Sequence, residues 1–183
     1  MNRIKGARHL RVQRPFALRQ VMEMAFRPHG SNRLDFVVAF AGTQVHSDGS
    51  GAGIGVLLDD KNGEPLVKVA QPVEAQEPDG AAYRAIVAAL QQARGLRAQR
   101  VAVFSDNEAV VGQLNRELPV PERLEPAFMQ ARALMNQFRW AGVRYGSGRR
   151  LAAASRAAYT AAASGASRST RYREPTLPLS FPA

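Results

Sequence analysis

Arginine is the residue type in this chain that is best placed to do chemistry, because it gathers at both ends. Residues 1–33 contain eight Lys or Arg and one acid, a net charge of +7, and residues 144–183 contain seven Arg and one acid, a net charge of +6. Residues 34–143 contain ten basic and 13 acidic residues, a net charge of −3. Clustered cations bind phosphates, so the pattern predicts two basic arms on a mildly acidic body.

The basic arms favour nucleic acid as the partner, most of all RNA or an RNA–DNA hybrid, held through its phosphates. One further candidate, in the body, is Arg84, and it is expected near the same surface as Arg149 and Arg150. The candidate phosphate-binding side chains are Arg3, Lys5, Arg8, Arg11, Arg14, Arg84, Arg149, Arg150, Arg168, Arg171 and Arg173. The alternative interpretation is that arginine-rich tails only keep the protein soluble.

Residues 1–33 also have features of an organellar transit peptide, because they are rich in Arg and poor in acid. A short amphipathic helix is predicted over residues 15–27. Its apolar face would hold Phe16, Leu18, Val21, Met22 and Phe26. The segment lacks the serine enrichment of such peptides before Ser31, so we expect a cytoplasmic protein, with organellar import as the alternative.

The composition of the chain excludes several classes of protein and of site. The chain has no cysteine, so it can form neither a disulfide nor a thiolate metal site. No apolar run approaches the roughly 20 residues that a membrane-spanning helix needs, and we expect no membrane partner. A length of 183 residues with 45% apolar residues suits one domain with tails. Nothing in the pattern indicates an oligomeric state.

The apolar pattern predicts an α/β domain over residues 34–163, between a basic extension at 1–33 and a flexible basic tail at 164–183. Three strands joined by turns should form an antiparallel meander, and strands reached through helices should then pair in parallel. The predicted strands span residues 34–40, 54–58, 65–69, 100–105 and 143–145. The predicted helices span residues 81–94, 107–117, 126–140 and 151–163.

Two acids and three glycines near these elements have a structural interpretation. Asp79 precedes one predicted helix and Asp106 precedes the next, which is where acidic side chains cap helix N-termini. The glycines at 51, 53 and 55 do not form a phosphate-binding loop, because no Lys-Ser/Thr follows them and no helix begins there. We expect them to serve turn formation and strand packing.

The order of the predicted elements resembles that of type 1 ribonuclease H (RNase HI), and five local strings strengthen the resemblance. The strings are FAGT at 40–43, GAGIGVL at 51–57, AAYRAIVAAL at 81–90, VFSDNEAVV at 103–111 and the segment 149–158. Together they span about residues 34–160. The resemblance implies a ribonuclease H-like fold, with a five-stranded mixed sheet flanked by helices and carrying basic N- and C-terminal extensions.

Members of this family cleave RNA in RNA–DNA hybrids with two divalent cations, which four carboxylates hold. The resemblance places these ligands at Ala41, Ala82, Asp106 and Ser155. Alanine has no ligand atom and serine is neutral, whereas Mg²⁺ and Mn²⁺ prefer anionic oxygens. The family's mobile histidine has no counterpart, since the histidines are at 9, 29 and 46. We therefore expect no catalytic residue, no cofactor and only a weak metal candidate, Asp106.

Three functions follow from these observations. The first is a catalytically inactive ribonuclease H-like protein, a pseudoenzyme, that binds nucleic acid through its basic arms. The second is a divergent ribonuclease H that still cleaves RNA in RNA–DNA hybrids with Mg²⁺ or Mn²⁺. The third is a structural component of a ribonucleoprotein.

Overall fold

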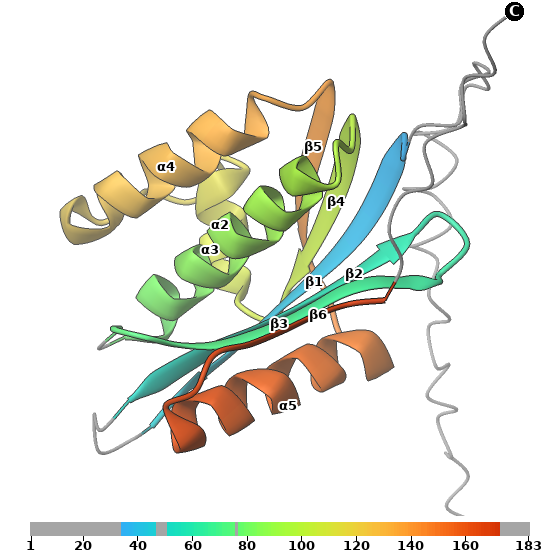
Figure 1. The fold of residues 1–183 in the computed structure, drawn as a ribbon. Coiled ribbons are helices and arrows are strands. Elements are labelled where there is room, and N and C mark those ends of the chain that lie inside the picture. The colour runs from blue at the N-terminus through green and yellow to red at the C-terminus, as the bar shows by residue number, and fades with distance from the viewer. Residues whose placement is uncertain (1–33, 47–50, 76, 173–183) are drawn as a thin grey trace, which may run out of the picture.

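The computed structural model describes residues 34–46, 51–75 and 77–172, which form a sheet with helices on both faces (Figure 1). The strands are β1 (Phe36–Val45), β2 (Ala52–Asp60), β3 (Pro65–Val73), β4 (Arg100–Ser105), β5 (Trp140–Tyr145) and β6 (Arg168–Arg171). The helices are α2 (Pro78–Gly95), α3 (Glu108–Leu114), α4 (Glu125–Met135) and α5 (Arg149–Ser164), with a 3-10 turn η1 (Glu122–Leu124) before α4. None of the helices in these ranges is long and apolar enough to cross a membrane. The helix predicted over 15–27 lies outside the described residues.

The sheet has the strand order β5-β4-β1-β2-β3-β6. The meander β1-β2-β3 is antiparallel, and β4 pairs in parallel with both β1 and β5. The predicted mixed α/β architecture is therefore confirmed. Parallel pairing follows from the connections, because β4 and β5 are each reached through helices that return the chain to the same edge.

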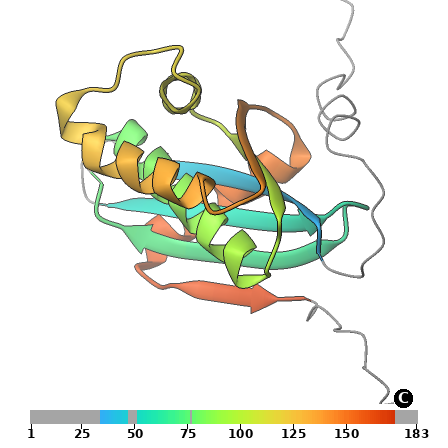
Figure 2. The same cartoon turned by 90° about the horizontal axis from the view of Figure 1, so that it is seen from above.

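The sheet has six strands, and the prediction of five was one short. Residues 168–171, which the sequence pattern assigned to the tail, form β6 and pair antiparallel with β3 (Figure 2). All four residues of β6 are exposed. This strand has no apolar alternation to reveal it, because its backbone hydrogen bonds to β3 rather than buried side chains hold it in place.

Both faces of β1 are buried, which explains its near-continuous apolar sequence. One face packs with β2 and α2 in the main core, and the other face packs with α5 (Figure 1). The residues of β1 on the α2 face are Val37, Ala39 and Ala41, and those on the α5 face are Phe36, Val38 and Phe40. The two-layer covering fixes the register of β1, since a one-residue slip would exchange its faces.

Helix α5 lies unusually close to the sheet. Its buried residues are Leu151, Ala154, Ala157, Ala158 and Ala161. A Cβ atom at Gly42, Gly53 or Gly55 would collide with backbone atoms of α5. These glycines are therefore required for close approach of two backbones, which confirms that Gly53 and Gly55 serve packing.

We expect Gly55→Ala to lower the free energy of unfolding by about 1–3 kcal/mol, because the added methyl group meets the carbonyl oxygen of Ala154. The matched control is Gly95→Ala at the end of α2, where a Cβ meets nothing within 4 Å. The control should be neutral or stabilising by up to about 1 kcal/mol. Urea denaturation of both variants measures this, and a Gly55→Ala protein as stable as the wild type would contradict the packing.

Candidate functional site

Asp106 directly follows β4, and its carboxylate accepts hydrogen bonds from two other elements. The Thr43 backbone N–H donates to Oδ2 at 3.2 Å, and the Thr43 Oγ1 hydroxyl donates to Oδ1 at 3.4 Å. The Ser155 hydroxyl donates to Oδ2 at 2.9 Å. Thr43 belongs to β1 and Ser155 to α5, so one half-buried carboxylate links β1, β4 and α5.

The structure brings together Ala41, Asp106 and Ser155, three of the four positions that the ribonuclease H resemblance singled out. Ala41 pairs with Ser105, the residue before Asp106, and the next residue of β1 lies against Ser155. Ala82 packs in the same core cluster as Ala41, and both are fully buried. The site therefore combines one buried methyl group, one hydroxyl and one carboxylate near the ends of β1 and β4, and Ala82 adds a methyl group to the core cluster that contains Ala41.

Thr43 was missed as a partner of Asp106, although it lies within the matched string at 40–43. The signal that would have found it is strand alternation, because Thr43 follows Ala41 by two residues and shares its face of β1. A threonine hydroxyl on that face, near the end of the strand, is well placed to donate to an acid on the neighbouring parallel strand.

The predicted cap roles of Asp106 and Asp79 are both wrong. Asn107 caps α3, since its side-chain oxygen accepts from the Val110 N–H at 2.9 Å. Helix α2 begins at Pro78, and the N-cap position falls on Glu77, which makes no side-chain cap bond. Proline suits the first helical turn because its missing N–H needs no partner there, so α2 starts one residue before Asp79.

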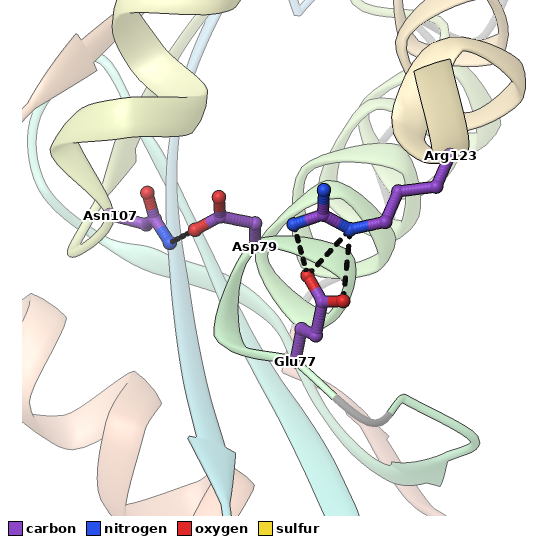
Figure 3. A network of polar contacts seen from close by, with 4 residues as sticks. All are labelled: Glu77, Asp79, Asn107 and Arg123. Carbon is purple, nitrogen blue, oxygen red and sulfur yellow. Dashed lines mark hydrogen bonds and ion pairs between the residues drawn. The ribbon is translucent and has the colours of Figure 1, made fainter. Parts of the chain in front are cut away.

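Asp79 instead joins a polar network at the start of α2 (Figure 3). Its carboxylate accepts a hydrogen bond from the Asn107 side-chain amide at 2.8 Å. Beside it, Arg123 of η1 holds the Glu77 carboxylate with contacts of 2.7 to 3.0 Å. This hydrogen bonding lowers the pKa of Glu77 and raises that of Arg123. The network fixes the connection before α4 against the first turn of α2.

The candidate cations do not lie on one surface. Arg150 forms a two-bond ion pair with the buried Asp59, with Nε to Oδ2 at 2.6 Å. Arg84 is exposed on α2, across the sheet from α5, so the expectation that Arg84, Arg149 and Arg150 share a surface is wrong. The reason is that the sheet lies between α2, which carries Arg84, and α5, which carries Arg149 and Arg150. The candidates Arg3, Lys5, Arg8, Arg11, Arg14 and Arg173 lie outside the described residues.

Within residues 34–46, 51–75 and 77–172, no three Asp, Glu, His or Cys side chains gather closely enough to hold a metal ion. Asp106 is the one carboxylate at the four family positions. The remaining oxygen at these positions is the neutral hydroxyl of Ser155, which donates to Asp106 at 2.9 Å and also lies 3.1 Å from the Leu151 carbonyl oxygen.

The strand order, the helix on the second face and the site at the ends of β1 and β4 define a ribonuclease H-like domain. A family model described as reverse transcriptase-like matches residues 39–163, more than half of the chain, and the chain belongs to this family. A comparison with curated protein sequences gave no match.

Solved ribonuclease H structures are similar to this chain. The N-terminal RNase H domain of Rv2228c from Mycobacterium tuberculosis matches at 28% identity with a TM-score of 0.65, over 69% of this chain and 92% of that chain. RNase H1 from Halobacterium salinarum matches at 19% identity with a TM-score of 0.62, over 71% and 96%. LC11-RNase H1 in complex with an RNA/DNA hybrid matches at 19% identity with a TM-score of 0.64, over 69% and 96%.

We expect Ser155→Ala to lower the free energy of unfolding by about 1–2 kcal/mol, because Asp106 loses a charge-assisted hydrogen bond between α5 and β4. The matched control is Thr160→Ala on the same helix, whose exposed hydroxyl bonds only to the Arg156 carbonyl one turn earlier. The control should stay within about 0.5 kcal/mol of the wild type. Equal losses in the two variants, measured by urea denaturation, would contradict the linking role of Ser155.

Burial raises the pKa of Tyr83 from the ordinary 10.0 to about 12, and the charge of Asp79 adds to the effect. The Tyr83 hydroxyl donates to the Gln113 side chain at 2.8 Å inside the core. Since the folded state holds this proton more tightly, the stability it contributes is present below pH 10 and is lost as pH rises through about 12. We expect the difference in phenolate absorbance between the wild type and Tyr83→Phe to develop near pH 12 in a pH titration. A difference centred at pH 10 would refute the burial effect.

Proposed function

We propose that this chain is a ribonuclease H-like protein that binds nucleic acid and does not cleave it. The observation that carries the proposal is the Asp106 carboxylate, which already accepts hydrogen bonds from Thr43 and Ser155. The same oxygens are the ones a divalent cation would require. The two alanines at the neighbouring family positions offer no ligand atom, so the protein's own donors take the place of cations around this acid.

Charge supports binding without cleavage. Two-metal hydrolysis of a phosphodiester needs several anionic oxygens to hold two dications close together, and one carboxylate does not balance that charge. A cluster of four carboxylates without metal repels phosphates, whereas a site with one carboxylate and three neutral residues repels them far less. The basic arms then add attraction, because they bring the net charge of the chain to +10.

The partner proposed is RNA or an RNA–DNA hybrid. A similar protein, LC11-RNase H1, was solved with an RNA/DNA hybrid bound. The cations at both ends of the chain suit any phosphate backbone, so they supply affinity and not sequence discrimination. Association with a larger ribonucleoprotein is compatible with this chemistry and would appear as cosedimentation with RNA-containing particles.

A second candidate function is a divergent hybrid-cleaving nuclease. Its supporting observation is the hydrogen bond that the Asn107 side-chain amide donates to Asp79, which places a second carboxylate beside the residue that follows Asp106. Asp79 and Asp106 together would give two anionic groups near the end of β4, for Mg²⁺ or Mn²⁺.

Filter binding and gel analysis with a labelled RNA–DNA hybrid separate the two candidates. We expect the full chain to retain the hybrid, with an affinity that falls as salt rises, and to release no product in Mg²⁺ or Mn²⁺. Single-stranded RNA and duplex DNA assayed in parallel identify the preferred partner. Cleavage that Asp106→Asn abolishes would overturn the proposal in favour of the nuclease, and absence of salt-dependent retention of every probe would overturn both.

A further inference from the structure

The two faces of the domain differ in how their charges are mixed. Residues 144–172, which form the end of β5, α5 and β6, contain six arginines and no acid. Residues 78–139, which form the helices of the other face with β4, contain eight arginines and six acids. Cations interspersed with acids are largely compensated, whereas an acid-free stretch contributes positive charge alone.

The pairing of β6 with β3 shows which of its side chains face α5. Ala70 packs against Ala157 and Ala161, so this face of β3 is the one that α5 covers. Arg168 pairs directly with Ala70, and paired residues of antiparallel strands project to the same side. Arg168 therefore lies on the α5 face. Arg171 follows Arg168 by three residues and pairs with Val67 of the main core, so it projects to the α2 face.

Lys68 extends the positive charge along the same face. It precedes Ala70 by two residues and pairs with Thr170, so it projects to the α5 side. Diagonal neighbours on paired strands lie about 7–8 Å apart, which sets the spacing of Lys68 and Arg168. Both side chains are exposed.

Helix α5 contributes two more exposed cations. Arg149 and Arg156 are seven residues apart, two helical turns, and so lie on one side of the helix. Arg156 directly precedes Ala157, whose side chain touches Ala70 beside Arg168. Figure 1 shows β6 running along the sheet edge next to α5. We call the four residues Lys68, Arg149, Arg156 and Arg168 the α5–β6 surface.

Asp59, the buried acid near the start of α5, does not neutralise the positive charge of this surface. Asp59 is 4% exposed, and both of its carboxylate oxygens contact Arg150. Its negative charge is thus compensated by a cation outside the α5–β6 surface. The four cations of the surface make no ion pair with any acid of the described residues.

We propose that the α5–β6 surface binds the phosphate backbone of nucleic acid. This inference rests on the proposed function and assigns part of the binding to the folded domain, on the face away from α2. Exposed arginines spaced along a helix and a neighbouring strand present several donors to successive phosphates. A phosphate backbone is the partner that fits, because it needs uniform positive charge and no apolar pocket.

The test compares two double variants of the full chain, Arg156→Gln/Arg168→Gln and the control Arg97→Gln/Arg139→Gln. Both remove two exposed arginines, and the control pair lies before β4 and β5, toward the opposite edge of the sheet from β6. Binding of a labelled RNA–DNA hybrid and of duplex DNA is measured across a salt series. The slope of log K against log salt is negative, and we expect the first variant to make it less steep by about 1.4–1.8. Each phosphate contact contributes roughly 0.7–0.9 to the steepness of that slope.

The control variant should reduce the steepness of the slope by less than half as much as Arg156→Gln/Arg168→Gln does. Urea denaturation of both variants confirms that each is folded, since all four positions are exposed. If the wild type binds and the two variants lose equal amounts of salt dependence, this inference is overturned and the proposed function stands. Absence of salt-dependent binding by the wild type would overturn the proposed function and this inference with it.

Discussion

The hydrogen bonds that converge on the Asp106 carboxylate are the interaction on which the rest of the structure depends. A carboxylate half-buried at the end of a strand requires partners, because an unpaired charge there is costly. Thr43 and Ser155 supply them from β1 and α5. In a metal-dependent nuclease the cations would fill this role. Here the Thr43 amide and hydroxyl and the Ser155 hydroxyl donate to Asp106, so one carboxylate links β1, β4 and α5.

The Ser155 bond is reached only because α5 lies so close to the sheet. Glycines at 42, 53 and 55 remove the side chains that would hold the helix away, and alanines on α5 match them. Close packing thus serves two purposes at once. It buries the second face of β1, and it presents the opposite side of α5, with Arg149 and Arg156, to solvent beside β6. The proposed phosphate-binding role of this face depends on that packing, because it is what leaves Arg149 and Arg156 exposed.

Sequence patterns predicted the architecture because both the apolar runs of β1 to β4 and the periodicity of α2 are direct consequences of burial. Element ends were less predictable: β1 continues to Val45 and α2 begins at Pro78, since local hydrogen bonding and proline geometry decide those positions. β6 escaped prediction because it buries nothing. The resemblance to ribonuclease H placed Asp106 beside Ser155, but their hydrogen bond depends on side-chain directions that spacing does not specify. Thr43, in contrast, could have been found from the alternation of side chains along β1.

The most direct test of a site closed by protein donors is thermal unfolding of the full chain with and without Mg²⁺ or Mn²⁺, at matched ionic strength, for the wild type and Asp106→Asn. A cation bound only by the folded state raises the unfolding midpoint in proportion to its affinity. We expect the midpoint of the wild type to respond to the divalent cation no more than that of Asp106→Asn. A rise in the wild-type midpoint that Asp106→Asn abolishes would show that Asp106 still holds a metal and would contradict the assignment of its oxygens to Thr43 and Ser155.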